Sequence, residues 1–377
     1  MAAIDPAAWN ALLAASDAPT PFMRHEMLLA LEASGSATPA TGWAPRVLTL
    51  GDGAHLRAAC VAYIKAHSYG EYVFDWSWAE AWERAGGRYY PKLTVAVPFT
   101  PVPGSRLLAR DAADRRALLR ALRAWLRREG LSSAHVLFLS EADRAAAAAE
   151  GWLLRSSVQF HWHNRTGPDG PYRSFDDFLA TLRHDKRKKI RQERRQVADA
   201  GVHFEVKRGT EIDAADWDHF HRCYSLTYAA HRSTPYLTRD FFARMAASLP
   251  EHWLLFLARR GGERIACSLI ALDPERRVSY GRYWGATAHV PLLHFEACYY
   301  QPLAWCIEQG WLRFEGGAQG EHKMARGLLP VRTWSAHFLA DPAFARAVER
   351  FLEREGEGVG AYVDELAEHS PHRREPG

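Results

Sequence analysis

The densest group of polar side chains lies in RFEGGAQGEHKMARGLLP, residues 313–330. Four glycines follow a predicted buried strand here, and glycine lets backbone amides approach a ligand closely. Loops at strand ends commonly carry function. We predict that Lys323 and Arg326 bind phosphates, and that Gln319 and His322 contact a substrate. An ordinary surface turn is the alternative interpretation.

A second polar group lies at the predicted start of a helix, just after the motif GRYWG. A helix N-terminus favours anions and can present amides to a developing oxyanion. Attack of an amine on an acyl donor needs a base, and a Glu or His near neutrality can serve. We predict that Glu296, His294 or Glu315 is that base, and that Arg282 and Tyr283 contact the substrate. Glu296 as a plain first-turn helix acid is the alternative.

The strongest local charge lies between Arg183 and Arg195, where eight cationic residues and two acids fall within thirteen positions. The apolar residues of this segment share one helical face, so the cations cover the rest of the helix. Arg187, Lys188 and Arg191 are predicted to bind the phosphates of coenzyme A or of tRNA. A solvated helix face is the alternative. The net charge of +4 is mild and does not by itself indicate a nucleic-acid-binding protein.

Aromatic residues crowd the segment AHSYGEYVFDWSWAEAWERAGGRYYPK. An alternating pattern would place Tyr69 and Glu71 on one side of a strand, with Asp75 nearby. We predict that these three residues line a cleft for the acceptor amine; a plain aromatic core is the alternative.

Metal ligation and secretion find little support in the sequence. His161 and His163 share a strand face, but spacing identifies no third ligand, so we expect no bound metal. The five cysteines form no C-x-x-C pair, which is typical of reduced thiols in a cytosolic protein. The N-terminal residues do not resemble a signal peptide, and no apolar stretch approaches 18 residues. We expect a soluble cytoplasmic protein without membrane insertion.

The elements that position these residues occur twice along the chain. VLTLGDGAHLRAACVAYI and LLFLARRGGERIACSLIAL each predict a β-hairpin, followed by a strand, a helix and another strand. Gly130 and Gly310 are predicted to end the two helices, and Pro302 to kink or divide the second. The order predicts a mixed α/β (α+β) fold with two related units, although chance similarity of two hairpins is the alternative.

We expect an N-terminal domain over 1–165 and a C-terminal domain over 166–345, followed by a helix and flexible tail over 346–377. A basic helix over 174–200 belongs to the second domain, with Ser174 as its N-cap and Gly201 at its end.

Several of these segments together resemble the FemAB-like predicted N-acyltransferases of the GNAT superfamily. The segments are HSYGEYVFDWSWAEAWERAGGRYYPKLTVAVPFTPVPGSRLL, VQFHWHN, GRYWG, LHFEACYYQ and FEGGAQGEHKMARGLLP. The resemblance covers roughly residues 20–350. It implies two GNAT-like acyltransferase units, each a mixed sheet flanked by helices. FemAB relatives take an aminoacyl group from aminoacyl-tRNA and form a peptide bond on an amine of a cell-wall precursor.

The sequence departs from two patterns of the wider superfamily. The Gln/Arg-x-x-Gly-x-Gly/Ala loop, which binds the coenzyme pyrophosphate in ordinary acetyltransferases, is not intact in either repeat. The first repeat offers Gly104 with Arg106, and the second offers Gly285. No long coiled-coil arm, present in some cell-wall aminoacyl transferases, is visible in the sequence.

Two functional classes follow. The first is an N-acyltransferase that forms an amide from an aminoacyl-tRNA or an acyl-CoA and a small-molecule amine, with tRNA as a further partner in the former case. The second is a non-catalytic binding module for tRNA, a nucleotide-linked sugar or a peptidoglycan precursor. A metal-dependent hydrolase using His161 and His163 is the weakest alternative. The sequence leaves the donor and the acceptor open.

Overall fold

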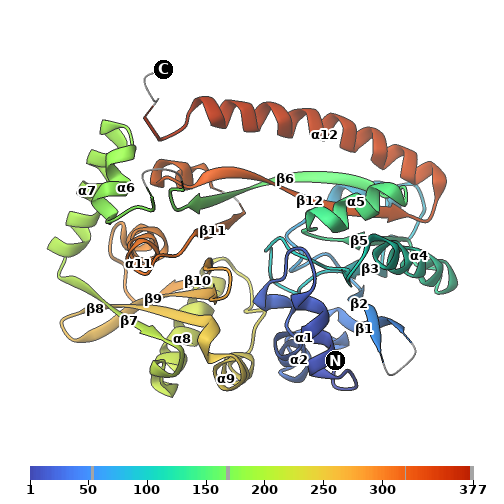
Figure 1. Cartoon of the computed structure of the whole chain (residues 1–377), viewed down its shortest axis with the longest axis horizontal. Coiled ribbons are helices and arrows are strands. Elements are labelled where there is room, and N and C mark those ends of the chain that lie inside the picture. The colour runs from blue at the N-terminus through green and yellow to red at the C-terminus, as the bar shows by residue number, and fades with distance from the viewer. Residues whose placement is uncertain (52–54, 167–169, 319, 374–377) are drawn as a thin grey trace. The chain divides into compact units, whose positions relative to one another are not determined.

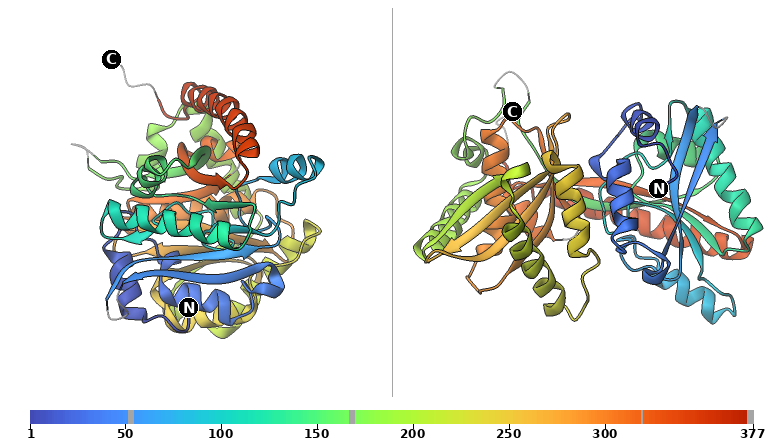
Figure 2. Two further views of the ribbon diagram at one scale, coloured as in Figure 1. Left: turned by 90° about the vertical axis from the view of Figure 1, so that its right-hand side faces the viewer. Right: turned by 90° about the horizontal axis from the view of Figure 1, so that it is seen from below.

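The computed structural model describes residues 1–51, 55–166, 170–318 and 320–373. The chain forms two compact units (Figures 1 and 2). Unit 1 comprises Met1–Ser157, Tyr236–Phe241 and Arg332–Tyr362, and unit 2 comprises Val158–Pro235, Phe242–Val331 and Val363–Gly377. Each unit combines segments from different parts of the chain. It therefore does not test the predicted contiguous domains, whose boundaries at 165/166 and 345/346 stay a prediction. None of the described helices combines the length and the hydropathy that crossing a bilayer requires.

Unit 1 has the strand order β1-β2-β3-β5-β12, with a short β4 paired to β2. Its strands are β1 (Trp43–Gly51), β2 (Leu56–Lys65), β3 (Lys92–Val95), β4 (Leu108–Ala109), β5 (Ser133–Val136) and β12 (Leu329–Leu339). Its helices include α1 (Pro6–Ala14), α2 (His25–Ala33), α3 (Trp76–Arg84), α4 (Ala112–Arg128) and α5 (Glu141–Ala149). β3 is antiparallel to β2 and parallel to β5.

The helix α4 shows why this unit folds as the sequence pattern predicts. Asp111 caps it by accepting a hydrogen bond from the Asp114 amide, and Gly130 follows its end with a φ of +63°. Leucines recur at helical spacing and are fully buried in the core that α4 forms with the sheet. These leucines are Leu118, Leu119, Leu122 and Leu126.

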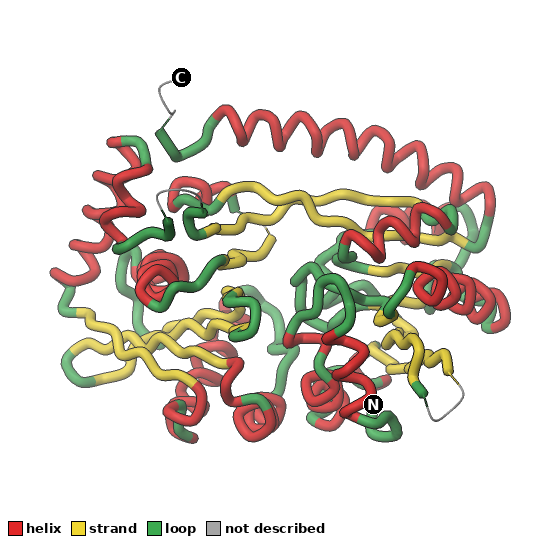
Figure 3. Tube along the Cα trace, viewed as in Figure 1, coloured by secondary structure: helices red, strands yellow, loops and turns green. Residues whose placement is uncertain are grey.

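Unit 2 has the strand order β6-β11-β10-β9-β8-β7. Figure 3 colours its strands yellow and its helices red. Its strands are β6 (Leu153–His163), β7 (Val202–Arg208), β8 (Trp253–Arg260), β9 (Glu263–Asp273), β10 (Val278–Ala286) and β11 (Arg313–Ala318). Its helices include α6 (Phe175–Thr181), α7 (His184–Asp199), α8 (Ala214–Ala230), α9 (Arg239–Ser248), α10 (Leu293–Phe295) and α11 (Gln301–Glu308). Figure 1 shows α8 on one face of this sheet and α11 on the other.

The predicted repeat of hairpin, strand, helix and strand is confirmed. β1–β2 and β8–β9 are the two antiparallel hairpins, and β3 and β10 each add a further antiparallel strand. After the helix, β5 pairs parallel to β3, as β11 pairs parallel to β10. The next strand in each unit comes from elsewhere in the chain, because β12 pairs with β5 and β6 pairs with β11.

The prediction of one basic helix over 174–200 is wrong at its centre. Ser174 is its N-cap as predicted, but the helix stops at Thr181 and a new one begins at His184. Leu182 between them is fully buried with an extended backbone, and it bridges to His372. The Arg183 amide donates to the Pro371 carbonyl, so residues 371–373, expected in a flexible tail, pair with this break. The helix before them, α12, spans Pro342–Glu368.

The prediction that Pro302 kinks or divides its helix is met by a local distortion and not by a division, because the backbone stays helical from Leu293 to Glu308. A π-helical turn over Glu296–Tyr300 lies between α10 and α11, directly before Gln301 and Pro302. Gly310 follows the end of α11 with a φ of +68°, which confirms its predicted role.

Candidate active site

The strands β10 and β11 part in the middle of unit 2. They pair from Val278↔Arg313 to Tyr280↔Glu315, and no further pair between them follows in the described residues. The β10 register shifts between Gly281 and Tyr283, so Arg282 forms a bulge where the strands part. Such bulges redirect side chains and end strand pairing. A narrow cavity of about 140 Å³ opens here; its lining includes Gly281, Phe314 and Gly316.

A second cavity of about 460 Å³ lies between the end of β10 and the start of α10. It shares Trp284 and His294 with the first cavity. Leu292, which precedes α10, has a φ of +67°, a strained conformation for a branched side chain. Strain of this kind clusters at functional sites. We call these two adjoining cavities, which share Trp284 and His294, the strand cleft.

His294 is the titratable side chain common to both parts of the strand cleft. Burial lowers its pKa to about 4, and the nearby charges of His322, Arg326 and Lys323 act in the same direction. Its ring lies 5.4 Å from that of Trp284 and 5.9 Å from that of Tyr299, centroid to centroid. At neutral pH the imidazole is therefore uncharged and can accept a proton, but a pKa this far below neutrality makes it a weak base.

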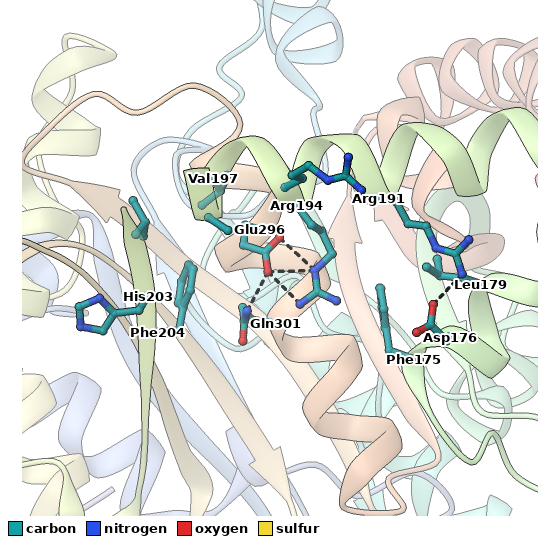
Figure 4. Close-up of a pocket in the computed structure, with 13 residues that line it drawn as sticks. Phe175, Asp176, Leu179, Arg191, Arg194, Val197, His203, Phe204, Glu296 and Gln301 are labelled. Carbon is teal, nitrogen blue, oxygen red and sulfur yellow. Dashed lines mark hydrogen bonds and ion pairs between the residues drawn. The ribbon is translucent and has the colours of Figure 1, made fainter. Parts of the chain in front are cut away.

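Glu296 lies only two residues further on but faces a different cavity (Figure 4). It pairs with Arg194 at 3.1 Å and accepts a hydrogen bond of 2.7 Å from the Gln301 amide. Burial raises its pKa, although Arg194 and Gln301 oppose the rise. Glu296 and His294, predicted as alternative bases at one helix start, thus line separate cavities, because side chains two residues apart on a helix point to opposite sides.

The cavity beside Glu296 has a volume of about 500 Å³ and is lined by residues of α6, α7, β7 and α11; we call it the arginine cavity. Arg191, Arg194 and Arg195 line it, against the two acids Asp176 and Glu296. Arg191 pairs with Asp176 at 2.8 Å, and Arg194 stacks over the ring of Phe175 at 4.7 Å. The cavity therefore carries an excess of positive charge.

Of the predicted phosphate ligands, Arg191 lines the arginine cavity, whereas Arg187 and Lys188 are not among its lining residues. Arg326 is buried, and its guanidinium contacts Glu193 at 3.0 Å and lies 3.5 Å from the ring centroid of Phe295. Lys323 donates to the Gly317 carbonyl at 3.3 Å and packs beside Gly316, which lines the strand cleft. Burial lowers the pKa of Lys323 to about 8.

Glu315, the third predicted base, lies on β11 between Phe314 and Gly316, which line the strand cleft, so alternation turns its side chain to the opposite face. It pairs with Arg313 at 3.0 Å and lies 3.8 Å from His161. Burial raises the pKa of Glu315 to about 7, and Arg313 opposes that rise. The same burial lowers the pKa of His161 to about 3.

Among the predicted substrate contacts, Arg282 and Tyr283 line the strand cleft, where Arg282 donates to the Tyr283 hydroxyl at 3.2 Å. His322 lies beside the cleft, 3.2 Å from the hydroxyl of Tyr299. Gln319 lies outside the described residues.

The predicted strand through Tyr69 and Glu71 is wrong. Residues 66–75 form a loop between β2 and α3, because Gly70 and Tyr72 take positive φ values of 80° and 60°. Tyr69 is 57% exposed, whereas Glu71 and Asp75 are buried and bind Lys92. These two acids therefore belong to an internal ion-pair network of unit 1, and their role in binding an amine stays a prediction.

Sequence reasoning missed several cleft and cavity residues. Trp284, Tyr299 and Cys298 line the strand cleft, and Arg194 is the partner of Glu296. Trp284 lies in the motif GRYWG beside Arg282 and Tyr283, which the sequence predicts as substrate contacts, so the same motif could have identified it.

A family model described as peptidoglycan biosynthesis/recognition, the FemAB-like model, matches residues 1–374. The chain belongs to the FemAB-like family. Among solved structures, this FemAB-like chain is similar to L-PGS from Bacillus licheniformis, with 13% identity and a TM-score of 0.55 over 92% of this chain and 97% of that one. It is also similar to FemX, with 10% identity and a TM-score of 0.54 over 92% and 98%. No curated protein matches it.

At these identities the likeness to solved structures shows the fold alone. The predicted fold class of the FemAB-like chain, a mixed α/β protein with two units of similar strand order, is confirmed, as is the predicted FemAB-like family.

Proposed function

We propose that the FemAB-like chain is an N-acyltransferase that uses the strand cleft of unit 2 to join an acyl or aminoacyl group to an amine. The observation that carries this proposal is His294, an uncharged imidazole that lines both parts of a cleft opened by two parting strands. The FemAB-like family description supports acyl transfer in peptidoglycan biosynthesis, which makes an amine of a peptidoglycan precursor the first acceptor to test.

The reaction that fits the cleft forms a C–N bond and breaks the C–S bond of a thioester or the C–O bond of an aminoacyl ester. The amine nitrogen attacks the donor carbonyl, and His294 accepts the proton that the nitrogen loses. Backbone amides where β10 and β11 part are suited to stabilise the oxyanion, since they are fixed in place before the reaction. His294 then returns the proton to the departing sulfur or oxygen.

The donor carries phosphates in either form, and the arginine cavity is suited to bind them. Arginine side chains match phosphate oxygens with paired hydrogen bonds, and three arginines line this cavity. Arg194 is paired with the buried Glu296, whereas the partner of Arg191 is the exposed Asp176, which holds it more weakly, so we assign the phosphate contacts first to Arg195 and Arg191. Both acyl-CoA and aminoacyl-tRNA remain proposed donors.

The test is direct detection of the amide product by mass spectrometry. The full chain is incubated with peptidoglycan-precursor amines and, in parallel, with an acyl-CoA series or a set of aminoacyl-tRNAs. We expect, with one donor class, a product whose mass equals that of the acceptor plus that of the free carboxylic or amino acid minus one water. A chain that binds donor or acceptor, measured by a rise in melting temperature, but forms no amide with either class would instead be a binding module.

A further inference from the structure

Three metal-ligating side chains meet on the far side of β9 from the strand cleft. They are His219 and Cys223 of α8 and Cys267 of β9, and their ligand atoms all lie within 4.8 Å of one another. The neighbouring residue Ser268 lines the cleft, so alternation along β9 places Cys267 on the opposite face. This cluster therefore lies outside the proposed catalytic site.

The local fold brings these side chains together. His219 and Cys223 are four residues apart on α8, so they point to the same side of the helix. Gly285 pairs with Cys267 in the β9–β10 ladder, and a Cβ atom at Gly285 would lie 2.1 Å from the Cys223 carbonyl oxygen. Only glycine permits this approach of α8 to the sheet, and Thr227 fixes it by donating to the Trp284 carbonyl at 2.8 Å.

The distance between Cys223 and His219 matches that of a zinc site. With Zn–S bonds of about 2.3 Å and Zn–N bonds of about 2.1 Å, tetrahedral angles place sulfur and nitrogen ligands about 3.6 Å apart. The Cys223 sulfur lies 3.4 Å from His219 Nε2. Small shifts of the third side chain would bring all three atoms to bonding distance of one ion.

Burial and charge also suit a divalent cation. Both cysteines are fully buried, whereas His219 is half-buried and leaves a route from solvent. Two thiolates would balance the charge of Zn²⁺, so the assembled site would carry no net charge.

We propose that His219, Cys223 and Cys267 bind one zinc ion, with a water molecule as fourth ligand on the side of His219. The ion would hold α8 against β9 and so stabilise β9, whose opposite face lines the strand cleft through Ser268.

The test measures zinc in the full chain, purified without chelator from zinc-supplemented medium, by mass spectrometry of the elements. We expect about one zinc ion per chain. Losing even an outer-sphere partner costs about 10–100-fold in metal affinity, so Cys267→Ser and His219→Ala should each bind zinc at least about ten-fold more weakly. Cys306→Ser is the matched control, because Cys306 is buried elsewhere, beside Ser279, and its loss should leave zinc binding unchanged.

A second measurement keeps the proposal testable if a variant does not fold. Cobalt added to the metal-free wild-type chain should produce an intense near-ultraviolet thiolate-to-cobalt band, equally in Cys306→Ser. Wild-type protein that contains no zinc and gives no cobalt band overturns the proposal. So does a Cys223–Cys267 disulfide in protein purified under reducing conditions, or zinc content that is equal in all three variants.

Discussion

Lys92 of unit 1 offers a stability prediction whose size follows from the structure. Its ammonium group is fully buried and donates hydrogen bonds of 2.6 Å to Ser68 and 2.8 Å to Glu71. It also donates a hydrogen bond to Asp75. One carboxylate oxygen of Asp75 and one of Glu71 are buried without a hydrogen-bond partner. The network therefore has little capacity to compensate for a lost cation.

Lys92→Met would leave Glu71 and Asp75 buried near each other, with Lys65, 4.0 Å from Glu71, as a remaining basic partner. Burial lowers the pKa of Lys65 to about 7, so this partner is mostly uncharged at pH 8. Removing one partner of a buried ion pair costs about 3–5 kcal/mol, so we expect a loss of that size in the free energy of unfolding at pH 8. Urea titration of the wild type, Lys92→Met and the control Lys188→Met measures it. Lys188 is exposed on α7, and its replacement should change stability by less than about 0.5 kcal/mol.

The pH dependence of this loss has a definite sign. Burial raises the pKa of Glu71 to about 7, against the opposing charge of Lys92, from an ordinary value of 4.5. A raised folded-state pKa means that the folded protein holds a proton the unfolded chain has lost, so stability falls as pH rises through that window. Without Lys92 this pKa rises further, so the loss should be largest at pH 8 and smaller at pH 5. A Lys92→Met chain within about 0.5 kcal/mol of the wild type at pH 8 would refute this reasoning.

Three further predictions concern unit 2. Gly285→Ala should lower the free energy of unfolding by about 1–3 kcal/mol in urea titration, because the added Cβ meets the Cys223 carbonyl; no change would mean that α8 can move away. Glu193→Gln should lower the free energy of unfolding by about 1.5–3 kcal/mol in the same assay, since Glu193 is buried and accepts hydrogen bonds from Tyr300 and Arg326. Glu211→Gln is the control, because Glu211 is exposed. Arg195→Met should raise the donor KM by up to about five-fold and leave kcat unchanged in steady-state kinetics, because the side chain is exposed; a lower kcat would contradict a pure binding role.

Local signals predicted the elements well where the deciding residues are neighbours in sequence. Glycines marked the ends of α4 and α11, Ser174 capped α6, and the two Gly-containing turns marked the hairpins. Pro302 likewise indicated an irregularity in its helix. Each of these features depends on backbone constraints within a few residues, which the sequence displays directly.

The misses involve partners that lie far apart in the chain. The break at Leu182 depends on residues 371–373, about 190 positions away, and no local pattern reveals that pairing. β6 pairs with β11, and β12 pairs with β5; these pairings are equally non-local. The prediction that Glu296 and His294 are alternative bases of one site was wrong for a different reason. Glu296 and His294 lie two residues apart on one helix and therefore line separate cavities, which the helical period of the predicted element already implied.

The central claim is that His294 accepts the amine proton in the strand cleft, and kcat/KM for amide formation tests it most directly. General-base catalysis contributes about 10²–10⁴-fold, so His294→Gln should lower kcat/KM by that factor. His163→Gln, an exposed histidine on β6, should retain wild-type activity. With a pKa of about 4 for His294, wild-type activity should not fall through a histidine titration near pH 6.5. Equal kcat/KM for the two variants would contradict the account.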